Sequence, residues 1–491
     1  MAARHPSARI LVIDKHSVPG GYASSFRRPR AKAVFDCSLH KLSGVGEGGN
    51  LRRILADVGL YHDLDWVYPK EFFRACLPSG EFSIGNDPEQ FLDVLIRHFP
   101  GEAAALRQLL AEVEVHGKNG YYMYQMIEGS HVAQMADLRY AHENLKAISV
   151  AEAFALRFRD DQLQALLAAP GMYVGGFPED LGYLYYLHVL YATLHKGNAY
   201  LLGGAQKLSD TLVERIVGAD GAMLLGTRVK AIMTNGASEA IGVDTTKGVF
   251  WSDQIFVNAS PAYAMTTLFE PTKELVSVKE KLAGLKPSRS VTTVYLTTDA
   301  DPQTLGLDGT EFMIFGTGQK PGVAARAGAE HASSDAETCE RAYWQDSAME
   351  VTNYHALDPS AGRVVCLNVL DAIGHWPARN SSSYKRKKER AAALLTERLY
   401  AVKPQLKGRV THVEVASPRT YQRFTNNTEG AGFGAIVGKN SSAFTFHRQF
   451  PIKGVHFLSS WVAGGGYEAA FGLAEMKVKR WKRIAAELVS A

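Results

Sequence analysis

Cysteine is scarce in this sequence, and the four that occur are widely spaced. Cys37, Cys76, Cys339 and Cys366 form no C-x-x-C pair, so neither a zinc site nor a disulfide framework is signalled. Sparse cysteines without such spacing are typical of a reducing compartment. We therefore expect a cytoplasmic protein that binds no metal.

Long hydrophobic runs are also lacking. The uncharged stretch from Leu181 to His195 is shorter than the roughly 18 to 20 residues that a membrane-spanning helix needs. The apolar run from Ile10 to Ile13 is too short for the core of a secretory signal, which takes about 7 to 15 residues. The sequence thus predicts neither a membrane span nor an export signal.

No charge of one sign dominates. The 54 Lys and Arg residues nearly balance the 50 Asp and Glu residues, and a formal net charge of +4 does not favour nucleic acid as a partner. The 46% hydrophobic fraction is that of an ordinary folded protein. Because a single core stops growing at about 250 to 300 residues, a chain of 491 residues is expected to form two or three domains. The oligomeric state is left open.

Two enzyme signatures are absent as well. The sequence contains no G-x-S-x-G and no H-E-x-x-H, which argues against a serine hydrolase elbow and a zinc protease helix.

The first informative segment is an apolar, β-branched run, Ile10 to Ile13, that ends at Asp14. The break Pro19-Gly20-Gly21 follows, so the pattern predicts a buried parallel strand that runs into a turn. A carboxylate at the tip of such a strand is placed to accept both hydroxyls of an adenosine ribose. On spacing alone, however, a lone Asp at a strand end is more often part of a surface turn.

Further elements follow from hydrophobic periodicity and from Gly and Pro breaks. They are two helices within 89–115 separated by Pro100-Gly101, a helix over 205–217, a strand pattern over 223–233, a turn at Lys247-Gly248, a buried strand over 254–257, strands of a second sheet over 290–298 and 363–370, and a loop over 318–337.

Two glycine clusters precede predicted helices. The G-x-G-x-x-G of 44–49 lies before a helix over 51–58, but 37–43 does not read as the buried strand that a dinucleotide fingerprint requires, so we interpret it as a flexible loop. The second cluster, 464–466, follows a strand over 455–458 and leads into a helix. Its backbone N–H groups could approach an anion or an aromatic ring, although a plain strand-to-helix turn also uses glycine.

Several motifs occur in one order along nearly the whole chain. They are Val12-Ile13-Asp14-Lys15, Val18-Pro19-Gly20-Gly21-Tyr22, Ser24-Ser25-Phe26-Arg27, Phe35-Asp36 with His40, Leu202-Gly203-Gly204-Ala205-Gln206-Lys207-Leu208, Thr227-Arg228-Val229-Lys230-Ala231-Ile232, Val257-Asn258-Ala259-Ser260-Pro261, Pro418-Arg419-Thr420-Tyr421, and Trp461 with Gly464-Gly465-Gly466-Tyr467-Glu468. In this order the chain resembles the FAD enzymes of the carotenoid (phytoene) desaturase, carotene isomerase and retinol saturase family.

The resemblance implies an α/β fold of two domains, with a discontinuous Rossmann-like FAD-binding domain and a substrate domain of mixed sheet and helices. The FAD-binding domain would comprise 1–85, 197–272 and 418–491. A helical substrate or lid part would occupy 86–196, and the mixed sheet would occupy 273–417. The implied activity is FAD-dependent desaturation, saturation or isomerisation of a long apolar polyene or isoprenoid by hydride transfer.

The same resemblance implies site residues. The cofactor-binding set is Asp14, Lys15, Gly20, Gly21, Ser25, Arg27, Val229, Ser260, Gly464, Gly465, Gly466 and Tyr467. For acid and base roles the candidates are His40, Arg419, Tyr421 and Glu468. Hydride transfer at a flavin needs mainly positioning, so a dedicated base is not required, and a histidine such as His40 is more often packed and hydrogen-bonded than catalytic.

One departure from the family concerns the segment before Asp14. The first strand and the glycine-rich phosphate loop of the family have no counterpart there, so the resemblance predicts either a start codon set too late or weakened FAD binding.

An aromatic and Met-rich region occupies the helical middle of the chain. Its members are Tyr121, Tyr122, Met123, Tyr124, Met126, Met172, Tyr173, Phe177, Tyr183, Tyr185, Tyr186 and Tyr191. These side chains could line an apolar tunnel or fill an ordinary core. The carboxyl-terminal helix carries Lys477, Lys479, Arg480, Lys482 and Arg483, which indicate a solvated face or a peripheral dock for anionic lipid.

Two alternatives stay open. One is a flavin amine oxidase, for which Tyr421 and Tyr467 would cage an amine. The other is a flavin-free carrier of apolar ligands that has lost the phosphate loop.

Overall fold

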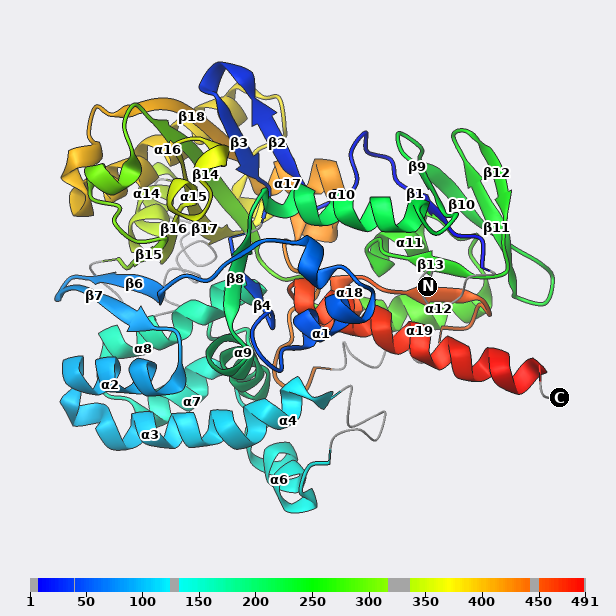
Figure 1. Cartoon of the computed structure of the whole chain (residues 1–491), viewed down its shortest axis with the longest axis horizontal. Coiled ribbons are helices and arrows are strands. Elements are labelled where there is room, and N and C mark those ends of the chain that lie inside the picture. Colours follow the sequence, from blue (N-terminus) through cyan, green and yellow to red (C-terminus); the bar gives the residue numbers. More distant parts are fainter. Residues whose placement is uncertain (1–7, 39, 124–131, 317–335, 442–449, 490–491) are drawn as a thin grey trace.

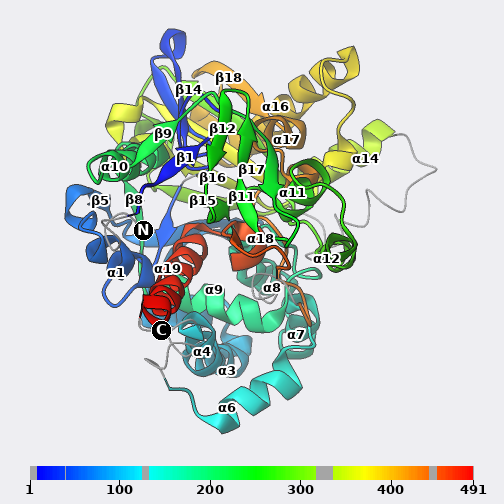
Figure 2. The same cartoon turned by 90° about the vertical axis from the view of Figure 1, so that its right-hand side faces the viewer.

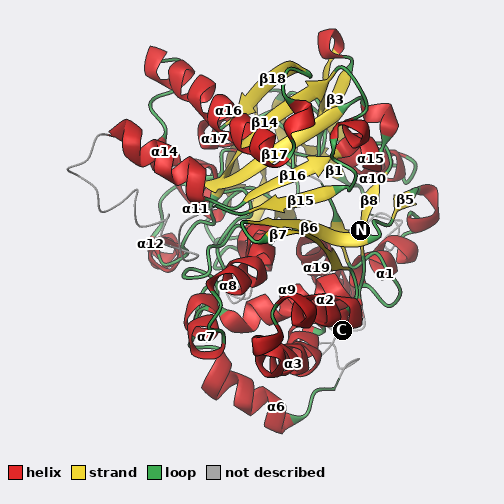
Figure 3. Ribbon diagram, turned by 90° about the vertical axis from the view of Figure 1, so that its left-hand side faces the viewer, coloured by secondary structure: helices red, strands yellow, loops and turns green. Residues whose placement is uncertain are grey.

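The computed structural model describes residues 8–38, 40–123, 132–316, 336–441 and 450–489. Its upper part in Figure 1 is built on a large mixed sheet, and helices form a layer beneath it. Parallel strand pairs, a three-stranded sheet and their helices lie to the right, close to the long helix at the carboxyl end. The views in Figures 2 and 3 show the same separation of strands above and helices below.

The large sheet has seven strands, and residues from two distant regions form it. Its order is β18 (Val410–Ala416), β14 (Ser290–Thr298), β17 (Val364–Asp371), β16 (Met349–Asn353), β15 (Glu311–Ile314), β6 (Glu71–Leu77) and β7 (Gly80–Gly85). All neighbours pair antiparallel except β15 and β6, which are parallel. The predicted strands over 290–298 and 363–370 are therefore present. By contrast, β6 and β7 precede the boundary proposed at residue 85 and yet complete this sheet.

Both faces of this sheet are buried, as the alternation of side chains in β14 shows. Val294 and Leu296 pack with α14 (Ala336–Asp346) and α16 (Ser382–Val402) on one face. Tyr295, between them in sequence, belongs to the core on the other face. Near that second core lie β2 (Ser25–Arg28), β3 (Ala33–Asp36), β4 (Leu42–Ser43), β5 (Trp66–Val67), β8 (Asn198–Leu201), α1 (Asn50–Asp57), α10 (Gly204–Val217) and α15 (Tyr354–Leu357).

The helical layer forms from sequences with apolar stripes. It contains α2 (Pro88–His98), α3 (Ala103–Glu112), α4 (Lys118–Tyr121), α6 (Met135–Tyr140), α7 (Val150–Arg157), α8 (Asp161–Ala168) and α9 (Tyr183–His195). Asp87 caps α2 and Pro100 separates α2 from α3, which confirms the predicted pair of helices. Helix α9 is apolar on nearly all sides, and this explains its central, buried position.

Two parallel pairs join segments that are far apart in the sequence. β1 (Leu11–Ile13) pairs with β9 (Ala222–Leu224), and β13 (Ile255–Val257) pairs with β19 (Val455–Phe457). Beside them lie β10 (Val229–Thr234), β11 (Ala240–Thr245), β12 (Gly248–Trp251), α11 (Pro261–Thr267), α12 (Lys273–Ala283), α17 (Pro418–Thr425), α18 (Ser460–Ala463) and α19 (Tyr467–Val489). The strand pattern over 223–233 forms two strands, β9 and β10.

One detail of the prediction for β1 is wrong. The strand is parallel, as expected, but it is not buried, because Leu11 is 38% exposed. The reason is that β1 borders a large cavity instead of packing between two layers. The predicted loop over 318–337 lies largely outside the described residues.

Candidate functional site

A continuous cavity of about 1720 Å³ runs along β1, the glycine segment before α19 and the helices α4 and α9. Asp14 and Gly465 both line it, although they lie near opposite ends of the sequence. Ligand sites usually measure about 300 to 1,000 Å³, so this cavity has room for more than one ligand of ordinary size.

Asp14 is held at the tip of β1 by backbone hydrogen bonds. Its N–H donates to the carbonyl of Leu224, and its own carbonyl accepts from the N–H of Thr227. One carboxylate oxygen accepts from the N–H of His16 at 2.9 Å. The carboxylate is therefore fixed at the cavity wall by the parallel pairing of β1 with β9.

Two basic residues share this end of the cavity. Lys15 and Arg228 both line it, and burial lowers the pKa of Lys15, with the charge of Arg228 adding to the effect and that of Asp14 opposing it. Val229 also lines the cavity, at a point where the pairing of β10 with β11 is irregular. This end thus brings the fixed carboxylate of Asp14 together with the cations of Lys15 and Arg228.

The glycines fall into two groups. A Cβ placed on Gly21 or Gly466 would meet no atom within 4 Å, and both residues line the cavity at positive φ. Gly20 instead packs tightly, because a Cβ there would lie 2.5 Å from the hydroxyl oxygen of Ser209 in α10. Gly21 and Gly466 therefore leave open space that a flat ring system could fill, which fits a flavin, whereas Gly20 allows the turn to pack.

Several predicted cofactor residues lie elsewhere. Ser25, Arg27, Ser260 and Gly464 do not line the cavity. The hydroxyl of Ser25 donates to the Asp36 carboxylate. Ser260 is buried at the start of α11, and Arg27 is exposed on β2. Ser25 and Ser260 therefore take part in local packing, and Arg27 lies at the surface. Tyr467 does line it, and its hydroxyl lies 3.1 Å from that of Ser38.

Arg419 and Tyr421, two of the candidate acid–base residues, do not reach the cavity. The guanidinium of Arg419 donates to the carbonyl of Trp376 at 3.0 and 3.3 Å. The hydroxyl of Tyr421 is buried 2.8 Å from that of Thr293, and burial raises the pKa of Tyr421. The Tyr421 side chain joins α17 to the large sheet, and the Arg419 side chain joins α17 to the loop that follows β17. Neither side chain is therefore available to a ligand in the cavity.

Glu468, the third candidate, lies in the cavity wall at the start of α19. Its carboxylate accepts hydrogen bonds from the hydroxyls of Tyr121 and Ser43, the latter at 2.7 Å. Burial raises the pKa of Glu468, and these hydrogen bonds oppose the increase. A Cβ on Gly44 would lie 2.0 Å from this carboxylate, so the first glycine of the G-x-G-x-x-G segment has a packing role.

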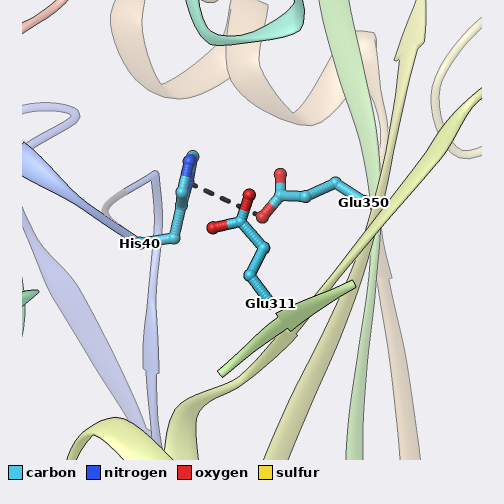
Figure 4. A group of neighbouring side chains, drawn as sticks. All are labelled: His40, Glu311 and Glu350. Atoms are coloured by element: carbon cyan, nitrogen blue, oxygen red, sulfur yellow. Dashed lines mark ion pairs between the residues drawn. The ribbon is translucent and has the colours of Figure 1, made fainter. Parts of the chain in front are cut away.

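His40, the fourth candidate, lies next to two carboxylates that the sequence analysis missed (Figure 4). Its Nδ1 is 3.8 Å from Oε1 of Glu350 in β16, and Glu311 begins the neighbouring strand β15. The register places both acids on the same face of the sheet. Burial raises the pKa of Glu350, Glu311 adds to this, and His40 opposes it. A buried acid inside an apolar strand is rare unless it is paired. The occurrence of Glu311 and Glu350 in apolar strands is therefore the feature of the sequence that could have revealed them.

The other end of the cavity is apolar and aromatic. Its lining there includes Phe72, Tyr121, Met123, Tyr173, Tyr185, His188 and Val189. Burial lowers the pKa of His188 to about 4, so this imidazole is neutral at physiological pH. Other aromatic residues of the predicted tunnel, Tyr183, Tyr186 and Tyr191, belong to the core instead, and Tyr124 and Met126 lie outside the described residues. The region therefore serves as both core and cavity wall.

One basic residue of the carboxyl-terminal helix forms an ion pair within that helix. Lys479 pairs with Glu475 at 3.0 Å, and the side chains of Arg480, Lys482 and Arg483 lie outside the described residues. Within the described part of the chain, no helix has the length and hydropathy to cross a bilayer.

Parallel strand pairs beside a long cavity, with a carboxylate at one strand tip, are typical of Rossmann-like proteins. Residues 1–58 match the family of NAD(P)-binding Rossmann-like domains. The chain is 21% identical to an all-trans-retinol 13,14-reductase of Danio rerio, over 91% of this chain and 78% of the relative. It is 24% identical to a neurosporene-forming phytoene desaturase of Rhodobacter capsulatus, over 52% of this chain and 48% of the relative.

Among solved structures, the cyclohexylamine oxidase of Brevibacterium oxydans has the same fold. The TM-score is 0.63 at 14% identity, over 99% of this chain and 95% of that one. Together these comparisons confirm the α/β fold with a Rossmann-like domain and the resemblance to the retinol saturase and carotenoid desaturase family. Most of the chain is thus similar to an oxidoreductase, and its amino-terminal part is similar to a Rossmann-like nucleotide-binding domain.

Proposed function

We propose that this chain binds FAD in the cavity and uses it to desaturate, saturate or isomerise carbon–carbon double bonds of a long apolar polyene or isoprenoid. The observation that carries this proposal is the cavity itself. It joins the Asp14 carboxylate, the open space at Gly466 and the aromatic wall of the helical layer in one continuous volume.

In this proposal Asp14 accepts hydrogen bonds from the adenosine ribose, while Lys15 lies near the diphosphate. Val229 meets the adenine through its backbone. Gly21 and Gly466 provide the flat space for the isoalloxazine, and bound flavin supplies the hydride chemistry. The protein positions the substrate bond and excludes water around it.

The relatives support the chemistry. One of the two relatives is a reductase of all-trans-retinol and the other a desaturase of phytoene, so each carries out a redox reaction on an apolar substrate. The lining residues Met123 and Tyr185 offer adaptable and stacking contacts for a molecule of this kind.

The test uses the purified chain incubated with FAD. We expect visible flavin absorbance that survives gel filtration, and conversion of all-trans-retinol or phytoene detected by mass spectrometry. Protein that holds no flavin but still binds retinol would support the carrier alternative and contradict the proposal. Conversion of cyclohexylamine or putrescine with release of peroxide would favour an amine oxidase, for which the common fold is the present support.

A further inference from the structure

The imidazole of His40 and the carboxylate of Glu350 form a pair in which one group lines the cavity and the other is buried behind it. The His40 side chain is 17% exposed and lines the cavity, whereas the Glu350 side chain is 6% exposed and does not. The 3.8 Å between Nδ1 and Oε1 is longer than a hydrogen bond, but it is short for two charges in a medium of low dielectric constant.

Glu350 is held in place on its other side. Its Oε1 accepts a hydrogen bond from the hydroxyl of Thr352 at 2.5 Å, and its Oε2 accepts one from the side-chain amide of Asn368 at 3.3 Å. Asn368 lies opposite Glu350 in the neighbouring strand β17. The carboxylate therefore has a fixed position, with the imidazole of His40 on its cavity side.

The second acid, Glu311, already has a cation. Nζ of Lys41 lies 2.8 Å from its Oε2, and the hydroxyl of Tyr173 donates to its Oε1. This ion pair is nearly dry, with 6% of the Lys41 side chain and 1% of the Glu311 side chain exposed. Because Lys41 supplies the positive charge here, the cluster of His40, Glu311 and Glu350 is better suited to holding a proton than a divalent cation.

The His40 segment lies beside the glycine segment assigned above to the flavin. Ser38, two residues earlier, donates to the carbonyl of Tyr22 at 2.9 Å and lies 3.1 Å from the hydroxyl of Tyr467. Tyr22 follows Gly21, and Tyr467 follows Gly466. The imidazole also packs 5.2 Å from the Tyr173 ring on the aromatic wall, so it lies where the cofactor and substrate regions meet.

We propose that His40 exchanges a proton with the substrate during the redox reaction, and that Glu350 is the positioning residue that stabilises the protonated imidazole. This inference rests on the proposed function. In saturation, the substrate π bond breaks as one carbon accepts hydride from reduced flavin and the adjacent carbon accepts the proton of His40, which becomes neutral. In desaturation, one carbon gives hydride to oxidised flavin, and the electron pair of the adjacent C–H bond becomes the π bond as its proton passes to His40.

The charge pair can be tested without cofactor, by NMR titration of the full chain carrying glutamate labelled with ¹³C at the side-chain carboxyl. Glu350→Gln identifies the Glu350 signal. In His40→Gln we expect this signal to titrate at higher pH than in the wild type, because the charge of His40 opposes the rise in the pKa of Glu350. The groups that also act on this pair are Lys41, Tyr173, Glu311, Tyr354 and Cys366. An unchanged midpoint contradicts the proposal.

Turnover by the FAD-loaded chain provides the second test. Loss of a general acid or base typically costs about 10²- to 10⁴-fold, so His40→Gln and Glu350→Gln should lower kcat while FAD binding and KM change little. They should also alter the pH profile, and added imidazole should partly rescue His40→Ala. The matched control is Glu102→Gln, a buried acid that accepts hydrogen bonds from the N–H groups of Arg159 and Asp160 outside the cavity.

The two proposals fail in different ways. Variants that keep the wild-type kcat and pH profile would overturn the role of His40 alone, because the wild type still converts the substrate. A wild-type chain that holds FAD and converts neither all-trans-retinol nor phytoene would overturn the proposed function, and the proton exchange with it.

Discussion

The carboxylate of Asp36 accepts a hydrogen bond from the backbone N–H of Ala205 at 2.9 Å. Asp36 thereby satisfies an otherwise unpaired donor in the first turn of α10. The same carboxylate accepts from the hydroxyls of Ser25 and Tyr200, the latter at 2.8 Å. A Cβ on Gly204 would lie 2.7 Å from it. Two motifs that are far apart in the sequence, Phe35-Asp36 and the glycine pair before Ala205, are therefore one structural unit.

Asp36→Ala should destabilise the fold by about 3 kcal/mol, because it leaves buried donors without an acceptor. Chemical denaturation followed by circular dichroism measures the change in the free energy of unfolding. Asp63→Ala, on the surface, is the control and should change it by less than about 0.5 kcal/mol. Equal effects of the two substitutions would contradict this assignment.

Asp14→Ala should weaken FAD binding about tenfold to hundredfold, the loss expected for hydrogen bonds to a charged group. FMN lacks the adenosine ribose, so its affinity should not change. Titration of the chain with each flavin, followed by fluorescence, measures both affinities. If Asp14→Ala weakens FMN and FAD binding equally, Asp14 does not contact the ribose.

Gly466→Ala should reduce FAD occupancy, because its methyl group would occupy the cavity at a φ of +101°. Gly248→Ala is a matched control, since Gly248 has a φ of +116°, has no atom within 4 Å of an added Cβ and lies outside the cavity. Backbone strain of about 1 to 3 kcal/mol is expected for both variants. Flavin absorbance per protein should fall for Gly466→Ala alone, and a similar fall in the control would show that strain is the cause.

Glu468→Gln should make stability less dependent on pH. The unfolded side chain titrates near 4.5 and burial raises the pKa of Glu468 in the folded chain, so the folded state binds this proton more tightly. Wild-type stability should therefore fall as pH rises from 4.5 through the folded-state pKa. Urea unfolding at several pH values should show a smaller fall for the variant. Parallel curves for the two proteins would contradict the prediction.

Val189→Phe should narrow the aromatic end of the cavity, which Val189 lines from α9. We expect KM to rise about fivefold or more, with a larger rise for phytoene than for retinol, in keeping with the usual cost of overpacking. Leu156→Phe is the control, because Leu156 is 83% exposed on α7. Steady-state kinetics with both substrates measures the difference, and an equal change in KM for the two would refute a steric role.

The sequence predicted elements with a strong local signal. The helices on either side of Pro100 and the strands β14 and β17 follow from periodicity and breaks, and ordered motifs placed Asp14 and Gly466 in one site. Exposure of β1 was missed, because a strand that borders a cavity has the same apolar residues as a buried one. Glu311 and Glu350 were missed too, since the pairing of β15 with β16 sets their neighbours. Arg419 and Tyr421 match a motif, but Tyr421 packs against the large sheet and Arg419 binds the loop that follows β17.

The pairing of β13 with β19 has a consequence for biosynthesis. A ribosome completes β13 long before it reaches residues 455–457, so the strand must wait for its partner while residues 258–454 emerge. Contacts between segments this far apart form slowly. Prosthetic-group capture should therefore be a late event, and truncated translation products that end before β19 should leave the ribosome colourless.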